Sequence, residues 1–453
     1  MRSALLATLL LLLFVPAASA TGTEVAVSRL PGPQSEAAIA IDPSNNQILL
    51  AGSNSFSERT MRAYGSTDGG ATWQTTTVYP APASTTAACA ADPGVAIDTQ
   101  GRQYYSFVRS TPCATGPPRL YVASRPGPAA AWGKPVLVAP LRTSRFDDKP
   151  AIAVDASAGS KYENRVYVAW TRVSHNGVLS ILVSHSDDGG RRWSRPHKAN
   201  RTGVEESYAT VAVSRSGIVY VGWNDITNFH VNITRSMDGG AHFEPERQAV
   251  AFGIVTIPHC GGGIVIPAQR LTCVQPNPIV SVDTSAGPFS GRVYVTYTLT
   301  NFQGDQGAAV TVFNSRLRAL AGYPLTKKAL LVAPTPKSEN ADQFWPASAV
   351  DPSTGALWAC FYDTRGDPKR TSAFYSCTVS SDGGRSWAPR IHAATVASDE
   401  TVPGADPREY GDYEGLAVAN GIAHPIWTDS RDLGTLAEEI YTTTLTPADF
   451  TSS

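Results

Sequence analysis

Acidic, basic and aromatic side chains stand at equivalent places along this chain, just before or just after short apolar segments. Those just before are Asp92, Asp148, Glu206, Trp345 and Tyr413, and those after a following segment are Arg172, Arg365 and Arg431. Carboxyl groups that lie close together have pKa values pushed apart, so they can serve as acid and base in cleavage of a glycosidic bond. Arginines grip a carboxylate with paired hydrogen bonds, and aromatic rings offer apolar faces to sugars. This chemistry requires a fold that gathers these residues at one place.

The apolar segments form a sevenfold repeat. Each is a short run that ends in an acidic or small residue, and the seven runs are Ala37–Asp42, Pro93–Asp98, Pro150–Asp155, Ala209–Ser214, Pro278–Asp283, Pro346–Asp351 and Glu414–Ala419. Their last residues are 56 to 69 positions apart. A second run follows each one and is rich in β-branched and aromatic residues, as in Arg165–Trp170. This period suits four-stranded sheets that repeat around an axis.

A turn written S-x-D-G-G-x-x-W recurs four times. Its copies are Ser66–Trp73, Ser186–Trp193, Ser236–Phe243 and Ser381–Trp387. The aspartate accepts backbone N–H bonds inside the turn, the glycines take positive φ, and the aromatic residue serves as an apolar anchor. The motif resembles the Asp-box (BNR) repeat of sialidases and related secreted β-propellers.

This resemblance implies an all-β propeller, and the repeat count predicts seven blades. Six blades are the alternative, because sialidases have six. The seventh unit lacks one strand, and we expect the segment Glu24–Arg29 to supply it and close the ring. Residues 1–20 have the charge, apolar core and A-x-A site of a secretory signal, so 21–453 is expected to form a single propeller domain.

The strand order predicts one functional face. If strands one and two join at the lower rim, then the polar residues described above share the upper face, and the Asp-box turns lie below. Sialidases use a tyrosine nucleophile activated by a glutamate, an aspartate acid and three arginines. The resemblance and the positions together assign Tyr413 as nucleophile, Glu206 as its base, and Asp92 or Asp148 as acid. Substrate binding is assigned to Arg172, Arg365, Arg431 and Trp345.

Structural roles are the alternative for several of these residues. Arg365 and Arg431 each follow an aspartate by two positions, so a local ion pair explains them as well as an anion clamp does. Tyr413 is equally suited to a packed position with a hydrogen-bonded hydroxyl. We therefore keep two functions: a secreted exo-sialidase-like glycosidase acting on a terminal acidic sugar, and a non-catalytic propeller that binds glycan or protein. A polysaccharide lyase is a third possibility that no motif favours.

The composition of the chain argues against nucleic acid and membranes as partners. A formal net charge of −1 offers no basic surface for nucleic acid, and no apolar run after the signal is long enough to span a membrane. We expect a secreted or periplasmic monomer that needs no cofactor or metal, since zinc motifs are lacking. The six cysteines fall into three pairs of near neighbours, which in an oxidising compartment suggests the disulfides Cys89–Cys113, Cys260–Cys273 and Cys360–Cys377, although spacing alone does not determine the pairing.

Overall fold

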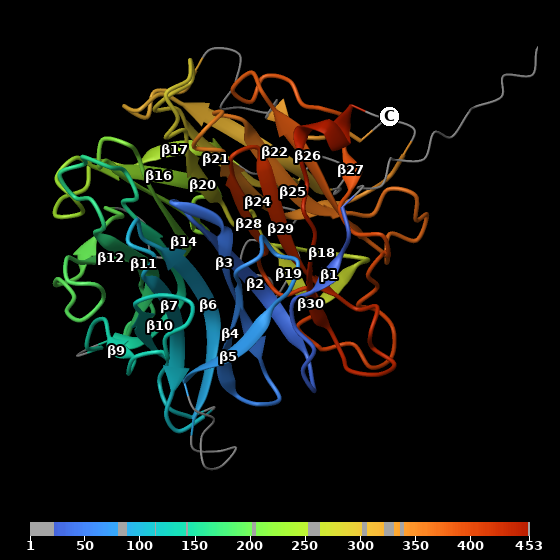
Figure 1. Cartoon of the computed structure of the whole chain (residues 1–453), viewed down its shortest axis with the longest axis horizontal. Coiled ribbons are helices and arrows are strands. Elements are labelled where there is room, and N and C mark those ends of the chain that lie inside the picture. The colour runs from blue at the N-terminus through green and yellow to red at the C-terminus, as the bar shows by residue number, and fades with distance from the viewer. Residues whose placement is uncertain are drawn as a thin grey trace, which may run out of the picture.

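The computed structural model is a seven-bladed β-propeller. It describes residues 22–79, 88–113, 115–141, 144–201, 205–251, 263–300, 306–320, 330–335 and 339–451. The signal segment 1–20 and Cys260 lie outside these ranges. Seven four-stranded antiparallel sheets follow one another around a central axis, and the chain colour in Figure 1 passes from blue through green to red as the ring is traversed. The prediction of seven blades is confirmed, and the six-bladed alternative is wrong.

The blades follow the chain order, with the innermost strand first in each of blades 1 to 6. Blade 1 contains β2 (Gln34–Asp42), β3 (Asn45–Ser55), β4 (Thr60–Ser66) and β5 (Gln74–Tyr79). Blade 2 contains β6 (Cys89–Ile97), β7 (Gln103–Ser110), β8 (Arg119–Arg125) and β9 (Val136–Leu137). Blade 3 contains β10 (Ser144–Val154), β11 (Val166–Ser174), β12 (Leu179–Ser186) and β13 (His197–Lys198). Blade 4 contains β14 (Glu206–Val213), β15 (Val219–Asp225), β16 (His230–Ser236) and β17 (Arg247–Ala251).

The later blades include an inserted hairpin and the closure of the ring. The hairpin consists of β18 (Ile264–Ile266) and β19 (Gln269–Val274). Blade 5 contains β20 (Ile279–Val282), β21 (Val293–Thr300), β22 (Gln306–Phe313) and β23 (Leu330–Leu331). Blade 6 contains β24 (Gln343–Val350), β25 (Leu357–Asp363), β26 (Phe374–Ser380) and β27 (Ile391–His392). Blade 7 contains β28 (Gly415–Ala419), β29 (Ile422–Asp429), β30 (Glu439–Thr442) and β1 (Val25–Ala26), and a 3₁₀ turn, η1 (Pro447–Phe450), follows it.

The amino-terminal strand closes the ring, as predicted. Val25 pairs with Thr442 and Ala26 with Tyr441, so the first strand of the chain is the outer strand of the last blade. The strand is shorter than the expected segment 24–29. Beyond Ala26 the regular ladder ends, because the backbone N–H groups of Val27 and Ser28 both donate to the Ile440 carbonyl. The Ser28 hydroxyl and the Leu30 backbone N–H then donate to the carboxylate of Glu439. Closure removes the exposed strand edges that an open array would present.

The four turns with the S-x-D-G-G-x-x-W pattern connect third and fourth strands. In the turn of blade 6, the Asp382 carboxylate accepts the Ser386 backbone N–H at 2.9 Å, and the Ser380 hydroxyl accepts that of Gly384 at 2.9 Å. The turns lie on the rim where strands one and two join, because Arg292 in blade 5 donates from Nη1 to the Gly383 carbonyl in blade 6 at 3.1 Å. The opposite rim is therefore left for the polar residues singled out in the sequence.

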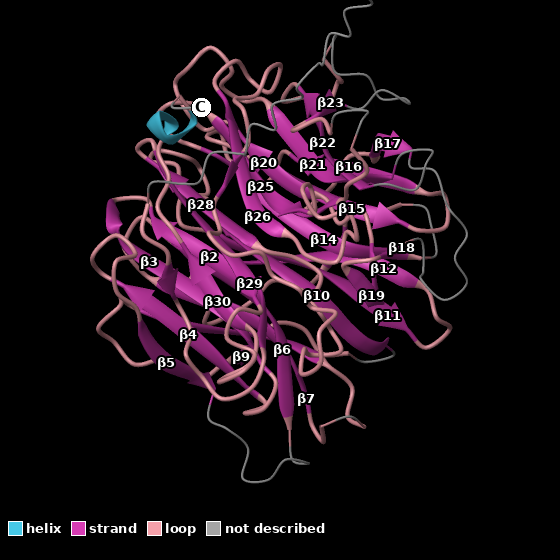
Figure 2. Cartoon of the chain, turned by 90° about the vertical axis from the view of Figure 1, so that its right-hand side faces the viewer, coloured by secondary structure: helices cyan, strands magenta, loops and turns pink. Residues whose placement is uncertain are grey.

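Most of the core lies in the apolar layers between blades. Tryptophans on second strands, including Trp170, Trp223, Trp358 and Trp427, are fully buried there. The Cys360–Cys377 disulfide joins facing residues of β25 and β26, and Cys89–Cys113 ties the start of β6 to the segment after β7. The predicted Cys260–Cys273 pair involves a residue outside the described ranges. Strands and loops make up nearly all of Figure 2, and within the described ranges no helix is long and apolar enough to cross a membrane.

Candidate active site at the upper mouth of the ring

The inner strands carry a ring of residues in the left-handed backbone region at the upper rim. They are Glu36, Asp92, Lys149, Tyr208, Asn277 and Trp345, with φ between 36° and 62°. Five of them coincide with a break in the register between strands one and two, and Asn277 comes just before β20. Side-chain-bearing residues adopt this region at a cost of roughly 1 kcal/mol or more, and such strain gathers at functional sites. The inner strands therefore begin earlier than the apolar segments indicated, and the polar residues lie on bulges inside them.

Asn54, at the end of β3, holds two of these bulges in place. Its side-chain amide donates to Glu36 Oε2 at 2.8 Å, and its Oδ1 accepts the backbone N–H of Asp92 at 2.9 Å. The same kind of support recurs between later blades, where Thr171 Oγ1 accepts the backbone N–H of Tyr208 at 3.1 Å. Blades 1 and 3 thus position the mouth residues of blades 2 and 4.

Lys149 lies at the centre of an acidic cluster. Its ammonium contacts Glu36 Oε1 at 3.3 Å and Asp412 Oδ2, while its backbone N–H donates to Asp92 Oδ2 at 3.2 Å. Burial alone would lower the pKa of Lys149, but Asp412, Glu36 and the neighbouring aspartates raise it well above its usual value. Lys149 therefore remains charged, and it neutralises only part of the surrounding carboxylates.

Two of the carboxyl groups have pKa values close to neutral pH. Burial raises the pKa of Glu36 to about 7 against the opposing effect of Lys149. Burial also raises the pKa of Asp92 to about 7, and a hydrogen bond with Asp148 adds to this. The pKa of Asp148 is itself raised, again chiefly by burial. Asp92 and Asp148 thus form a pair that favours holding one proton between them, which is an arrangement able to donate and accept protons near neutral pH.

Tyr413 lies beside this cluster. Its ring meets that of Tyr208 edge-on with centroids 6.0 Å apart, and its hydroxyl donates to the Pro93 carbonyl at 3.3 Å. Burial raises the pKa of Tyr413 well above its usual value, and the charges of Glu36 and Asp92 add to that effect. The phenol is therefore neutral in the resting protein, and it would need a base to act as a nucleophile.

A cavity of about 240 Å³ extends below these residues into the ring. Lys149, Tyr208, Tyr413 and Glu414 line it, and most of the remaining lining is apolar or small and comes from the inner strands of six blades. Glu414 is 5% exposed; its Oε1 accepts from the Tyr362 hydroxyl at 2.6 Å and the Thr428 backbone N–H at 3.0 Å. Burial raises the pKa of Glu414 to about 8. Polar groups that can exchange protons therefore surround one end of a largely apolar cavity.

Glu206, expected as the base for Tyr413, lies in a different environment. It is fully buried, faces Asp225 across β14 and β15, and has a pKa raised to about 8, chiefly by burial. The carboxyl groups whose charges act on Tyr413 are instead those of Glu36 and Asp92. Glu36 is thus better placed than Glu206 to serve Tyr413. Glu36 stands directly before the first apolar segment, as Asp92 stands before the second, but spacing along the chain does not tell which of these carboxyl groups meets Tyr413.

The three arginines expected as an anion clamp each have a local carboxylate partner. Arg172 pairs with Asp147 at 2.6 Å in blade 3, and Arg365 with Asp363 at 2.5 Å in blade 6. Arg431 pairs with Asp429 at 2.6 Å in blade 7. The ion-pair interpretation is therefore confirmed for Arg365 and Arg431 and extends to Arg172.

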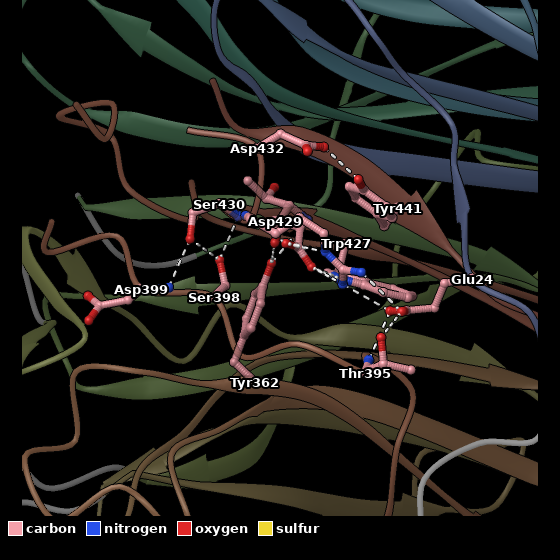
Figure 3. A network of polar contacts seen from close by, with 12 residues as sticks. Glu24, Tyr362, Thr395, Ser398, Asp399, Trp427, Asp429, Ser430, Asp432 and Tyr441 are labelled. Atoms are coloured by element: carbon pink, nitrogen blue, oxygen red, sulfur yellow. Dashed lines mark hydrogen bonds and ion pairs between the residues drawn. The ribbon is translucent and has the colours of Figure 1, made fainter. Parts of the chain in front are cut away.

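The contacts of Arg431 show what its ion pair does. Its guanidinium also binds Glu24 beside the closing strand at 2.9 Å, and Glu24 accepts the Thr395 backbone N–H at 3.0 Å. Figure 3 shows Glu24, Thr395 and Asp429 gathered in this network. Arg431 thus ties the amino-terminal segment to blade 7, which is a structural role.

Trp345 also differs from its expected role as a sugar platform. It is 1% exposed, and its indole N–H donates to Gln269 Oε1 of the β18–β19 hairpin at 2.9 Å. The hairpin is held in turn by Glu409, whose carboxylate accepts the backbone N–H groups of Arg270, Leu271 and Thr272. The hairpin therefore covers the blade 6 side of the mouth, which the repeat pattern did not predict because the insertion has no counterpart in other blades.

No group of three or more His, Cys, Asp and Glu side chains in the described ranges has the arrangement of a metal site. The carboxylates at the mouth surround an ammonium group instead.

Comparisons with known proteins support the fold. No family model and no curated protein matches the chain. A solved structure of a protein of unknown function from Dyadobacter fermentans is 13% identical, with a TM-score of 0.51, over 95% of this chain and 100% of that one. The Hadza microbial sialidase Hz136 is 13% identical, with a TM-score of 0.48, over 90% and 75% of the two chains. Trypanosoma rangeli sialidase is 12% identical, with a TM-score of 0.48, over 77% and 58%. At 13% identity, the likeness to the Dyadobacter fermentans structure concerns architecture only.

Proposed function

We propose that the protein is a sialidase-like glycoside hydrolase whose reacting groups are Asp92, Glu36 and Tyr413. The observation that carries the proposal is the pair of carboxyl groups, Asp92 and Glu36, each with a pKa of about 7, beside a tyrosine at the entrance to a cavity. General acids and bases work best when their pKa lies near the working pH. Buried carboxyl groups tuned in this way are typical of sites that cleave glycosidic bonds.

The roles follow from the proton balance. Asp92, protonated within its pair with Asp148, gives its proton to the leaving oxygen as the glycosidic bond breaks. Tyr413 attacks the anomeric carbon, and its phenolic proton passes to Glu36. Water then attacks the glycosyl-tyrosine and gives its proton to Asp92, and Glu36 returns the phenolic proton to Tyr413. Both carboxyl groups end in their starting protonation states.

The expectation of a terminal acidic sugar has less support from the geometry. A carboxylate on the substrate needs a cationic partner, and Arg172, Arg365 and Arg431 are already paired with aspartates. Lys149 is the cation at the mouth, and Glu36 and Asp412 both contact it. The hydrolase proposal therefore does not depend on the identity of the sugar.

A non-catalytic binder is the second candidate function. The ion pairs of Lys149 with Glu36 and Asp412 favour it. A network of mutually paired charges can also serve only to hold neighbouring blades together, with no role in catalysis. A binder would present the same mouth to a glycan or a protein without needing Asp92 to transfer a proton.

A panel of fluorogenic glycosides, neutral, basic and sialic, tests the proposal. Hydrolysis of at least one substrate is expected, with a bell-shaped dependence of kcat/KM on pH centred near neutrality, because Asp92 must be protonated while Glu36 is ionised. Asp92→Asn and Tyr413→Phe should each lower kcat by about 100-fold or more. Glu206→Gln is the matched control at a buried carboxyl away from Tyr413, and it should retain activity. Release from none of the substrates would refute the hydrolase and leave the binder. Equal rates in all variants would refute the roles of Asp92 and Tyr413.

A further inference from the structure

The mouth carries more negative charge than its single ammonium group can neutralise. Four carboxyl groups, those of Glu36, Asp92, Asp148 and Asp412, all act electrostatically on Lys149. Near pH 7, with one proton shared by Asp92 and Asp148 and Glu36 about half ionised, two to three negative charges remain beside one positive charge. A ligand that brings a positive charge would relieve this imbalance, and a ligand that brings a carboxylate would worsen it.

Asp412 is the carboxylate that a ligand would meet first. Its side chain is 31% exposed and that of Lys149 is 21% exposed, whereas that of Glu36 is 8% exposed. Asp412 comes directly before Tyr413, and its backbone carbonyl accepts the side-chain amide of Asn277 at 3.1 Å. The most accessible charge is therefore negative, and it is held at the entrance by the backbone.

A second observation in the cavity points to a hydrogen-bonding ligand. Glu414 lines the cavity together with Lys149 and Tyr413 and is 95% buried, while its Oε2 has no hydrogen-bond partner within the described ranges. Because the pKa of Glu414 is raised to about 8 and its Oε1 already accepts two hydrogen bonds, Oε2 carries the proton near neutral pH. Buried carboxyl groups are ordinarily paired, so this O–H group at the cavity wall is a donor available to a hydroxyl oxygen of a bound sugar.

The aromatic pair adds to the same preference. Lys149 Nζ already lies 5.8 Å from the centroid of the Tyr413 ring, and the Tyr208 ring meets that ring edge-on. Ring faces attract cations and pack against the C–H faces of sugars, whereas they offer nothing to a carboxylate.

We propose that the mouth binds a sugar bearing a protonated amine, through Asp412 and the carboxyl groups behind it, and discriminates against sugars bearing a carboxylate. This inference names the substrate class of the site in the proposed function and rests on that site. It reverses the charge preference that the Asp-box resemblance implied, because the repeated turns lie on the opposite rim and do not determine the charge of the mouth.

Calorimetric titration with three probes tests the charge preference without requiring catalysis. The probes are methyl β-glucosaminide, its N-acetylated counterpart and N-acetylneuraminic acid, at low salt and about pH 7, where the amine is largely protonated and Glu36 is about half ionised. The free amine should bind about tenfold or more tightly than the N-acetyl sugar, as one added ion pair in a partly buried site allows, and the acidic sugar more weakly than both. The amine preference should decrease as salt is added.

Variants test whether Asp412 is responsible for the preference for the amine. Asp412→Asn should reduce affinity for the amine about tenfold and change affinity for the N-acetyl sugar little, while Asp412→Glu should restore much of the loss. Asp187→Asn is the matched control, since Asp187 is a 61% exposed carboxylate on the opposite rim, paired with Arg165. Near-ultraviolet circular dichroism checks that each variant is folded.

The outcomes separate this inference from the hydrolase proposal. Tighter or equal binding of N-acetylneuraminic acid, or no binding of any probe, overturns the amine preference. Hydrolysis of neutral or sialic glycosides without preference for the amine leaves the hydrolase standing and overturns the inference. Selective binding of the amine with no hydrolysis of any glycoside supports the inference and refutes the hydrolase.

Discussion

Replacing Asp92 by asparagine should change how the stability of this protein depends on pH. Asparagine has nearly the shape of a protonated aspartic acid and can still accept the backbone N–H of Lys149, which Asp92 Oδ2 accepts at 3.2 Å. The variant therefore keeps the bulge and removes only the ionisation. Any change in the pH dependence of unfolding then reports the protonation of this carboxyl group.

The size of the effect follows from the pKa of Asp92, which burial raises from 3.8 to about 7. The folded protein binds the Asp92 proton more tightly than the unfolded chain does, so protonation of Asp92 stabilises the fold. This contribution to the free energy of unfolding is fully present below the unfolded pKa and is lost as pH rises through the folded pKa. A shift of this size corresponds to about 4 kcal/mol when the loss is complete. Between pH 5 and pH 8, about 3 kcal/mol of this should be lost in the wild type and not in Asp92→Asn.

Urea unfolding at pH 5 and at pH 8 measures the difference. Other buried carboxyl groups with raised pKa values, such as Glu414 and Glu439, also weaken the wild type as pH rises, so the quantity to compare is variant minus wild type. Asp68→Asn is the control. Hydrogen bonds from Thr72 lower the pKa of Asp68, so its contribution is lost only as pH falls through the acid range and should not change between the two pH values. A variant-minus-wild-type difference that is equal at pH 5 and pH 8 would show that Asp92 does not titrate there, and its role as general acid would be refuted.

Three further predictions concern the scaffold. Asp382→Ala should lower the free energy of unfolding by about 1–3 kcal/mol, because the backbone N–H groups of the blade 6 turn lose a charged acceptor; equilibrium denaturation measures this, and no change would contradict the role of the turn. Arg431→Met should cost about 3–5 kcal/mol, since Asp429 is fully buried and would lose its ion pair, and limited proteolysis near Glu24 should show the amino-terminal segment released; an intact segment would argue against this tie. Replacing both Cys360 and Cys377 by alanine should cost about 3 kcal/mol, because their loop of 17 residues is no longer closed in the unfolded chain, and reducing agent should then have no further effect on blade 6.

The sequence by itself determined the architecture. The seven apolar segments, the four turns with aspartate and paired glycines, and the early segment that completes the last blade are all local patterns. Strand periodicity, turn chemistry and edge pairing depend on a few neighbouring residues, so they can be recognised without knowing the fold. The same reasoning placed Asp92, Asp148 and Tyr413 on one face and offered the ion pairs of Arg365 and Arg431 as an alternative to ligand binding, and the structure bears out these pairs.

Only the tertiary structure decided which polar groups meet and what charge they share. Glu36 replaced Glu206 as the carboxyl group that acts on Tyr413, since closure of the ring brings blade 1 beside blade 7, and the order of segments along the chain does not show which residues then meet. Lys149, from blade 3, contacts Glu36 of blade 1 and Asp412 beside blade 7, and the pKa values near 7 arise from burial among those partners. Electrostatic energy depends on distance in space and on burial, which spacing along the chain does not report.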